Sequence, residues 1–222
     1  MHHYILTRFS VLDGKSPINP YFGVKTRKNS NMAKFLFNPS RMEEKFHVFE
    51  SITIPSIEKQ TDKNFTWLIY SSDSLPNEYK DRLLEHKNAK THIIFVKNFR
   101  GMYSDIKKHL QGKENYSTTR LDDDDGLNPK FLKALNKYEA NEQHIISFPH
   151  GKKIKRVKDD YIVKGKVNYK KIATGLSAIN MNIFSTGNHT KVNKKYPLIY
   201  DSLKDAYSVF CAPFAKNTRR KC

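Results

Sequence analysis

The stretch Thr118-Thr119-Arg120-Leu121-Asp122-Asp123-Asp124-Asp125-Gly126-Leu127-Asn128-Pro129 places four aspartates in a row. Like charges at this spacing repel one another, and an unpaired carboxylate is costly to bury, so the cluster must be solvated or neutralised by cations. The Thr-rich residues before it are typical of a strand, and Asn128-Pro129 is typical of the start of a helix. This order predicts a place at the carboxyl edge of an open α/β sheet, where such folds bind ligands.

Four interpretations of the acidic cluster compete. A calcium loop starting at Asp122 would place Lys133 at its twelfth position, where a bidentate Glu is required. An aspartyl-phosphate nucleophile belongs after a first strand, whereas this cluster follows the fourth. A solvated acidic turn is the alternative without function, and it stays open. The fourth interpretation is an Asp-x-Asp site in which Mg²⁺ or Mn²⁺ neutralises the diphosphate of a nucleotide sugar, because these hard ions prefer oxygen ligands.

Strand-like and helix-like segments alternate through the first two thirds of the chain, which predicts a parallel α/β sheet with right-handed crossovers. A polar loop is expected over residues 13–31. The expected strands are 4–9, 65–70, 91–96, 116–121 and 144–148. The expected helices begin at a capping box at Ser40 and end or kink at Pro55, run over 76–86, are capped by Ser104, and follow Asn128-Pro129 as far as Tyr138.

The pattern changes after residue 151. Residues 152–171 are rich in Lys with alternating apolar positions, which predicts an antiparallel hairpin that turns near Asp159-Asp160. One more strand over 173–179 and a final helix over 202–209 are expected. The lysine-rich segment has a simple explanation as a solvated hairpin face; its functional alternatives are steering of phosphates or docking to an anionic glycan or a membrane-borne acceptor.

Length and composition limit the class of protein. The chain has 222 residues and no linker rich in Pro, Gly or Ser, so one domain is expected. A hydrophobic content of 38% suits a globular fold, and the formal charge of +18 therefore belongs on its surface and calls for an anionic partner. Cys211 and Cys222 are expected to be reduced thiols in a cytoplasmic protein. No apolar run approaches the ~20 residues of a membrane span, which leaves peripheral membrane contact open.

Several segments together resemble a known family. In order and spacing they are similar to the putative rhamnosyltransferase family of GT-A-type glycosyltransferases, over about residues 4 to 135. The segments that carry the resemblance are Tyr4-Ile5-Leu6-Thr7-Arg8-Phe9, Phe49-Glu50-Ser51-Ile52-Thr53-Ile54-Pro55-Ser56-Ile57, Gln60-Thr61, Phe65-Thr66-Trp67-Leu68-Ile69 and Thr119-Arg120-Leu121-Asp122-Asp123-Asp124-Asp125.

The resemblance implies an α/β, GT-A-like single domain over residues 1–222, with a mostly parallel twisted sheet flanked by helices and a smaller antiparallel C-terminal portion. Residues 1–126 would bind the nucleotide sugar and 127–222 would face the acceptor. The implied reaction moves rhamnose or another hexose from a UDP-, dTDP- or GDP-linked donor to a hydroxyl of a glycan or glycoprotein, with inversion and with Mn²⁺ or Mg²⁺ as cofactor.

The resemblance also assigns roles around the cluster. Asp124 would contact the metal directly, and Asp122 would contact the ribose or the metal and its water. Asp125 would orient a hydroxyl of the donor sugar. The remaining donor contacts fall on strand ends: Thr7 and Arg8 on the base or ribose, Asp73 likewise, and Arg120 either on the diphosphate or in a structural ion pair with the cluster.

The acceptor side is less specified, because the resemblance weakens there. His189 in a Gly-Asn-His loop is expected either as a third metal ligand or as an exposed loop histidine. An inverting transfer needs a carboxylate base, and Asp201 is selected for this role from a set that also contains Asp159, Asp160 and Asp205.

The rival class is a basic nucleic-acid-binding protein or a metal-dependent nuclease, suggested by the basic charge and the acidic cluster. The sequence shows no basic-aromatic interleaving on a nucleic-acid module and no second acidic cluster for two-metal chemistry, so no nucleic-acid partner is expected.

Overall fold

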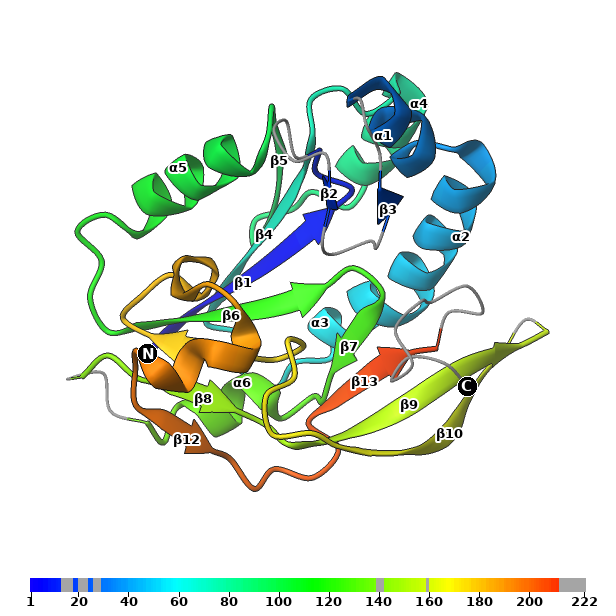
Figure 1. The fold of residues 1–222 in the computed structure, drawn as a ribbon. Helices are drawn as coiled ribbons and strands as arrows, with labels where there is room; N and C mark the ends of the chain where they lie inside the picture. Colours follow the sequence, from blue (N-terminus) through cyan, green and yellow to red (C-terminus); the bar gives the residue numbers. More distant parts are fainter. Residues whose placement is uncertain (13–17, 20–23, 26–28, 139–141, 159, 212–222) are drawn as a thin grey trace.

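A seven-stranded sheet flanked by helices and a smaller four-stranded sheet beside it make up the protein (Figure 1). The computed structural model describes residues 1–12, 18–19, 24–25, 29–138, 142–158 and 160–211. The strand order is β12-β8-β11-β6-β1-β4-β5 in the larger sheet and β10-β9-β13-β7 in the smaller one. The predicted α/β class, with a mostly parallel sheet and a smaller antiparallel portion, is confirmed.

The elements have the following bounds. The larger sheet consists of β1 (His2–Phe9), β4 (Phe65–Ser72), β5 (Thr91–Val96), β6 (Tyr116–Asp122), β8 (Ile145–Ser147), β11 (Ser177–Ile179) and β12 (Leu198–Tyr200). The smaller sheet consists of β7 (Asp125–Leu127), β9 (His150–Val157), β10 (Asp160–Asn168) and β13 (Tyr207–Phe210), and β2 (Ile18–Asn19) pairs with β3 (Val24–Lys25). The helices are α1 (Asn29–Leu36), α2 (Pro39–Val48), the π-helix η1 (Phe49–Thr53), α3 (Ile54–Glu58), α4 (Asn77–Leu84), α5 (Phe99–Leu110), α6 (Phe131–Leu135) and the 3₁₀-helices η2 (Ile183–Thr186) and η3 (His189–Lys194).

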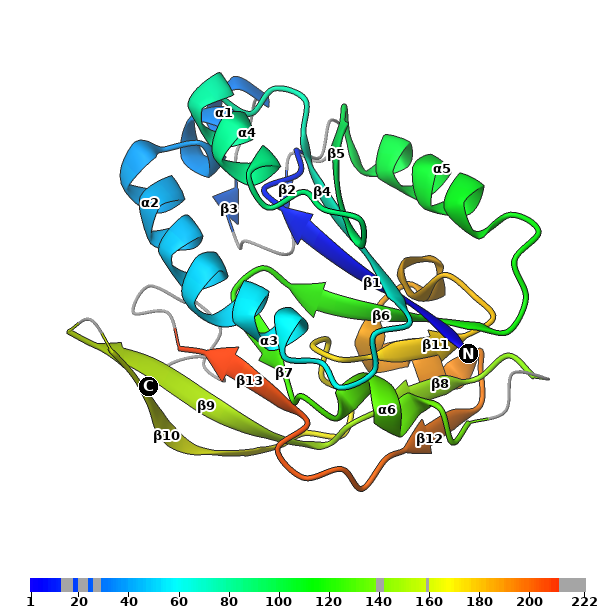
Figure 2. The same cartoon turned by 180° about the vertical axis from the view of Figure 1, so that it is seen from behind.

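The central strands are buried on both faces, as their nearly continuous apolar sequences predict. β1 runs parallel to β4 and to β6, and β4 runs parallel to β5. On β1, Ile5 and Phe9 belong to the core under α2, α3, α4 and α6, whereas Tyr4 and Leu6 belong to the core under α5, η2 and η3. The alternation of side chains along β1 therefore supplies two cores, one on each face of the sheet. Figure 2 shows α2, α3 and α4 from behind.

The helical segment after residue 38 differs from its prediction at both ends. Asn38 caps α2 by accepting a hydrogen bond from the backbone N–H of Arg41, so the expected capping box at Ser40 is wrong. Pro55 does not end the segment, because the chain passes through η1 into α3, where Pro55 occupies the first turn. A proline is tolerated in a first turn, where its missing N–H has no intrahelical partner.

Two further helix starts are shifted. α5 begins at Phe99 with Asn98 as its N-cap, and its side chain accepts from the N–H of Gly101, so the expected cap at Ser104 is wrong. The carboxamide oxygen of Asn128 accepts from the N–H of Lys130 ahead of α6. Asn128 thus shapes the approach to α6, and the helix ends at Leu135 rather than at Tyr138.

The C-terminal third differs most from its prediction. β8 lies where a parallel strand is expected, but the antiparallel β11 separates it from β6. The expected hairpin is confirmed as β9 and β10. The expected helix over 202–209 is wrong: residues 207–210 form β13, which pairs with β7 and β9. Pairing with two strands that are distant in the sequence determines the conformation of this segment. The buried Tyr207 and Val209 lie two residues apart, which is the period of a strand.

One buried cluster contains residues of both sheets, among them Ile5 of β1, Leu127 of β7 and Val209 of β13. The single domain and its division after residue 126 stay predictions. Cys211 is disulfide-bonded, so the expectation of a reduced thiol is wrong for this residue, and Cys222 lies outside the described residues. Within the described part of the chain, no helix has the length and apolar character needed to cross a membrane.

Candidate active site

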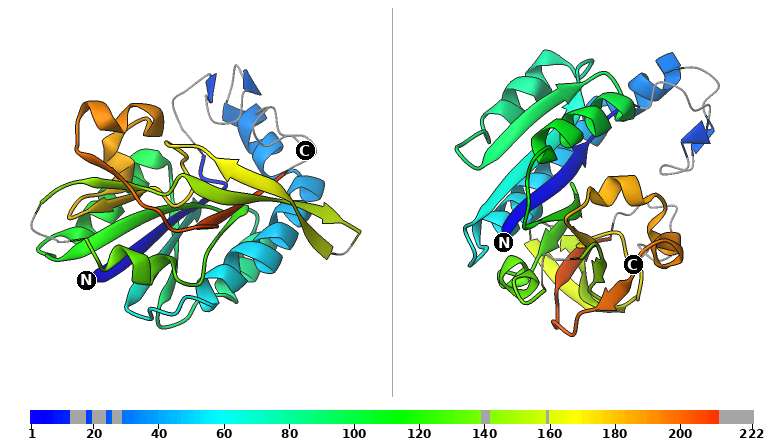
Figure 3. Two further views of the ribbon diagram at one scale, coloured as in Figure 1. Left: turned by 90° about the horizontal axis from the view of Figure 1, so that it is seen from below. Right: turned by 90° about the vertical axis from the view of Figure 1, so that its left-hand side faces the viewer.

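The acidic cluster links the two sheets. Asp122 is the last residue of β6 and lies opposite Arg8 of β1 in the parallel register, at the carboxyl edge of the larger sheet. Asp125 is the first residue of β7 in the smaller sheet. Asp123 and Asp124 form the turn between β6 and β7, so the predicted position of the cluster at the carboxyl end of a strand is observed. Figure 3 gives two further views of the two sheets. The next element is a strand, however, and α6 follows only after it.

Asp122 is held by two guanidinium groups. Arg120 donates from Nε and Nη2 to Oδ1 of Asp122 at 3.1 and 3.0 Å, and Nη2 of Arg8 lies 3.9 Å from the same oxygen. Phe184 of η2 lies beside both arginines: its ring centroid is 5.0 Å from Cζ of Arg8 and 5.9 Å from Cζ of Arg120. Phe99 lies 5.5 Å from Arg8. The strand ends thus present two cations in a partly apolar setting.

Asp123 points to the opposite side, into α2. It forms an ion pair with Lys45, and both side chains are almost completely buried. Burial raises the pKa of Asp123, and the ammonium of Lys45 opposes that shift. The backbone carbonyl of Asp123 accepts a hydrogen bond from the Thr53 hydroxyl of η1 at 3.2 Å. Asp123 therefore anchors the turn to the helical segment.

Asp124 is half-buried and lies in the same electrostatic group. Burial lowers the pKa of Arg41, and the charges of Asp123 and Asp124 oppose that shift, which puts Arg41 within electrostatic reach of both carboxylates. The Arg41 side chain also donates to the backbone carbonyl of Leu36 at 2.6 Å. The cations of α2 thus compensate the part of the cluster that faces them.

Asp125 is fully buried inside the smaller sheet. Its carboxylate accepts a hydrogen bond from the Thr174 hydroxyl and another from the N–H of Phe210 at 3.3 Å. The structure therefore places Asp125 as a connection between β7, β13 and the segment before β11, and not beside Asp122. Its predicted contact with a donor sugar stays a prediction.

Thr7 and Asp73 lie apart from the two arginines. Thr7 is fully buried on the α2 face of β1, where its hydroxyl accepts a hydrogen bond from the indole N–H of Trp67 at 2.9 Å. Asp73 follows β4 and is exposed, with its carboxylate accepting from the hydroxyl of Ser74 at 3.1 Å. Of the predicted donor contacts, the structure brings together Arg8, Arg120 and Asp122.

His189 lies at a pocket beside Arg120. The pocket is lined by Tyr103 of α5, Arg120, Leu176 and the residues of η2 and η3 that include Phe184 and His189. Among the described residues, no three side chains of the types His, Cys, Asp and Glu gather into a group that could hold a metal ion. The structure thus does not join His189 to Asp122 and Asp124 in one ligand set.

Asp201 lies at the far side of the larger sheet, directly after β12, which is three strands away from β6. It is buried and accepts from the Tyr138 hydroxyl at 2.7 Å and the N–H of Leu203 at 2.7 Å, and it pairs with Lys137 at 2.8 Å. Burial alone would raise the pKa of Asp201, but these partners outweigh it and lower the pKa. The structure gives Asp201 a fully engaged structural position away from Arg8, Arg120 and Asp122.

Of the other candidate bases, the two that the structure describes belong to the smaller sheet or to the segment directly before one of its strands. Asp160 begins β10 and is exposed, and Asp205 pairs with Lys152 of β9 at 3.0 Å. Asp159 lies outside the described residues. The identity of the base therefore stays a prediction.

A family model described as "Putative rhamnosyl transferase" matches residues 2–209. The chain belongs to this family. The predicted resemblance is confirmed and extends beyond residue 135. A comparison with curated proteins found no match.

Among solved structures, this protein resembles S. aureus TarS, residues 1–349, with a TM-score of 0.54 and 10% identity. The same protein in complex with UDP gives a TM-score of 0.52 and 11% identity. Each match covers 96% of this chain and 61% of the TarS chain, so the chain spans less than two thirds of the length of that neighbour. The similarity shows a shared fold and confirms the predicted GT-A-like architecture.

Sequence reasoning missed the residues that surround the cluster in this family member. Lys45 and Arg41 lie about eighty residues before the cluster and read as ordinary residues of an amphipathic helix. Phe184 lies about sixty residues after it, and Thr174 about fifty. One signal was present: Arg41 and Lys45 are four residues apart, so they share a helix face with the apolar Met42 and Phe46 beside them, which places two cations next to the core.

Proposed function

We propose that the chain transfers rhamnose or another hexose from a nucleotide-diphosphate donor to a hydroxyl group of a glycan. The observation that carries this proposal is the convergence of Arg8 and Arg120 on Asp122 at the carboxyl ends of two adjacent parallel strands. Family membership supports the same class of reaction.

The two arginines suit the leaving group of this reaction. As the bond between the sugar C1 and the diphosphate breaks, negative charge accumulates on the diphosphate oxygens. Guanidinium groups bind such oxygens in a bidentate manner, and the low local dielectric beside Phe99 and Phe184 strengthens the attraction. Arg8 and Arg120 are already ordered around Asp122, so little reorganisation is needed when the donor binds.

The carboxylates of the turn fit a divalent cation by their chemistry, because a set of oxygen ligands suits Mg²⁺ or Mn²⁺. Asp124 and Asp122 would hold the ion. Asp124 is the first candidate, since the Asp122 carboxylate is engaged with Arg120. A bound ion supplies Lewis-acid neutralisation of the departing diphosphate. Asp123 and Asp125 serve the fold instead, through Lys45 and Thr174.

The donor is proposed to be linked to UDP, with dTDP and GDP as the other nucleotides to test. TarS, which shares the fold, has been crystallised with UDP. The hydroxyl of Thr7 already accepts a hydrogen bond from the indole of Trp67, so Arg8 is the β1 residue that is better placed to contact the nucleotide. The acceptor is proposed to be a glycan or glycoprotein hydroxyl, whose oxygen attacks C1 while a carboxylate takes its proton. Inversion at C1 and Asp201 as that base stay predictions.

The proposal is tested by thermal unfolding with UDP, dTDP or GDP in the presence of Mn²⁺. A ligand at roughly a hundred times its Kd stabilises the fold by ~2.7 kcal/mol and raises Tm by about 5–10 °C for a domain of this size. We expect such a rise with one nucleotide for the wild type and for Asp81→Ala, an exposed aspartate of α4. We expect it to be lost in Asp124→Ala and in Arg120→Ala.

Hydrolysis of a panel of nucleotide sugars then identifies the donor sugar. Stabilisation by DNA or RNA with a steep salt dependence, and none by any nucleotide, would instead favour the nucleic-acid-binding class. If the nucleotide raises the Tm of Asp124→Ala as it does that of the wild type, the proposed metal contact of Asp124 is wrong. If it raises the Tm of Arg120→Ala equally, the proposed contact of Arg120 with the diphosphate is wrong.

A further inference from the structure

The hairpin of β9 and β10 extends beyond the sheet that carries it. β13 pairs with β9 only at residues 152–154, whereas β9 and β10 pair with each other as far as Val157 and Asp160. Among the described residues, the distal half of the hairpin therefore pairs with no third strand, and its tip extends past the end of β13 (Figure 1).

The two faces of this distal half differ. In an antiparallel pair, residues directly opposite one another lie on the same face. Tyr161 lies opposite Arg156 on the inner face. Tyr161 stacks on His47 of α2 at a ring separation of 6.0 Å, and Arg156 pairs with Glu44 of α2 at 3.3 Å. These contacts fix the hairpin against α2 and leave the other face directed outwards.

The outer face combines lysine with aliphatic side chains. Ile162 lies opposite Lys155, and Val157 is two residues along β9 from Lys155 on the same face. Val157 is 42% exposed and Ile162 is 41% exposed. Val163 is 59% exposed but lies opposite the buried Ile154, on the face of Tyr161 and Arg156, and does not belong to this outer face. Exposed aliphatic residues concentrated at the end of a projecting hairpin indicate contact with another surface.

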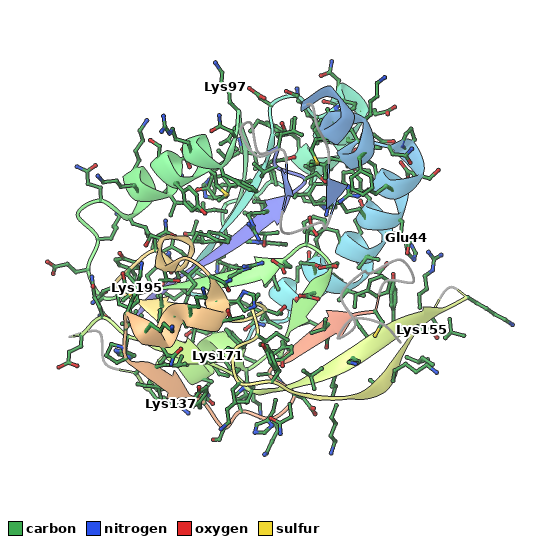
Figure 4. All side chains as sticks on the ribbon, viewed as in Figure 1. Glu44, Lys97, Lys137, Lys155, Lys171 and Lys195 are labelled. Atoms are coloured by element: carbon green, nitrogen blue, oxygen red, sulfur yellow. The ribbon has the colours of Figure 1, made fainter. Side chains whose placement is uncertain are left out.

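The charge of the hairpin is strongly basic. Residues 150–168 contain seven lysines and arginines and two aspartates. Arg156 and Lys152 are paired with Glu44 and Asp205, and Asp160 is the first residue of β10. Lys155 is exposed in the distal half of the hairpin, beside which Figure 4 labels it. The outer face therefore offers positive charge and aliphatic surface together.

We propose that this outer face docks on an anionic lipid bilayer. Lysines near a membrane surface are attracted to anionic headgroups, and aliphatic side chains gain by entering the boundary between headgroups and acyl chains. A second copy of the chain is a poor occupant, because lysines on an edge strand oppose strand pairing and both copies carry the same charge. Single-stranded nucleic acid is a poor occupant too, since Tyr161, which could stack on a base, faces α2.

Sedimentation of the full chain with vesicles tests this docking surface. Vesicles of phosphatidylcholine alone are compared with vesicles that also contain phosphatidylglycerol. We expect binding to the anionic vesicles only. Replacement of Lys155, Lys158 and Lys164 by Gln should weaken binding roughly 10- to 100-fold, given the attraction per lysine near an anionic surface. A matched triple variant at the exposed Lys87, Lys97 and Lys113 should bind as the wild type does.

A second pair of variants separates a bilayer from other polyanions. Val157→Ser with Ile162→Ser should weaken vesicle binding severalfold, while Leu84→Ser with Ile199→Ser, which are 41% and 38% exposed, should not. Circular dichroism and Tm verify that each variant is folded. Equal weakening by both lysine triples would overturn the proposal in favour of a general charge effect. Vesicle binding that is unchanged by Val157→Ser with Ile162→Ser and is matched by binding to RNA or to an anionic polysaccharide would overturn the choice of a bilayer.

Discussion

The parallel core of β1, β4, β5 and β6 and the smaller sheet of β7, β9, β10 and β13 are held together in different ways. In the parallel core, each strand is an apolar run bounded by polar residues; β1, β4 and β5 lie side by side in chain order, and β6 lies on the other side of β1. In the smaller sheet, β7 and β13 pair although about eighty residues separate them along the chain. The strands of the parallel core are therefore specified by their local sequence pattern. The strands of the smaller sheet are specified by pairing with segments that lie far away in the sequence.

The largest effect is expected where the two regions meet. Lys45→Met leaves the buried carboxylate of Asp123 without its cation, and removing one partner of a buried ion pair costs about 3–5 kcal/mol. Denaturation in urea measures the loss. The double variant Lys45→Met with Asp123→Asn should recover most of it, because no buried charge remains. A loss below about 1 kcal/mol in the single variant would show that the pair does not hold the sheets together.

The same variant has a defined pH dependence. Burial raises the pKa of Asp123, and loss of Lys45 removes the cation that opposes this shift. The native state of the variant then binds a proton more tightly than the unfolded state, so its stability decreases as the pH rises through the folded-state pKa. The deficit relative to the wild type should thus be full above that pKa and shrink as the pH falls toward 3.8, the ordinary value of the carboxyl group.

A smaller effect is expected at Gly151 of β9. A Cβ atom there would lie 2.2 Å from the ring of the fully buried Tyr207, so the core of the smaller sheet must shift. Overpacking of this kind costs roughly 1–3 kcal/mol in Gly151→Ala. Gly165 of β10 is the matched control, since a Cβ atom there meets nothing within 4 Å. Equal midpoints of thermal unfolding for the two variants would contradict the observed packing.

The smallest effect concerns the parallel region. Asn98→Ala removes the side chain that caps α5 and should destabilise the protein by about 1 kcal/mol, as the loss of an N-cap usually does. Ser104→Ala should change the stability by only a few tenths of a kcal/mol, because Ser104 lies exposed inside the helix. A larger loss of stability in Ser104→Ala than in Asn98→Ala would instead support Ser104 as the N-cap, as expected from the sequence.

The sequence predicted the strands of the parallel core to within one or two residues, and it placed Arg8 and Asp122 at the ends of their strands; the register that brings the two opposite one another is a finding of the structure. It could not predict that β11 inserts antiparallel beside β6, since no local pattern encodes the neighbour of a strand. Residues 207–210 were read as part of a helix for the same reason. The partners of the acidic cluster were missed because Lys45, Phe184 and Thr174 approach it only through tertiary structure.

The short turn between β6 and β7 has a mechanical consequence. Asp122 moves with one sheet and Asp125 with the other, and only Asp123 and Asp124 separate them. Behind this turn, a Cβ atom on Gly126 would lie 3.3 Å from side-chain atoms of Ile52 and Ser56, so the backbone there has little room to slide. A rotation of the smaller sheet would therefore displace the carboxylates of Asp122, Asp123 and Asp124 at the carboxyl edge of the larger sheet.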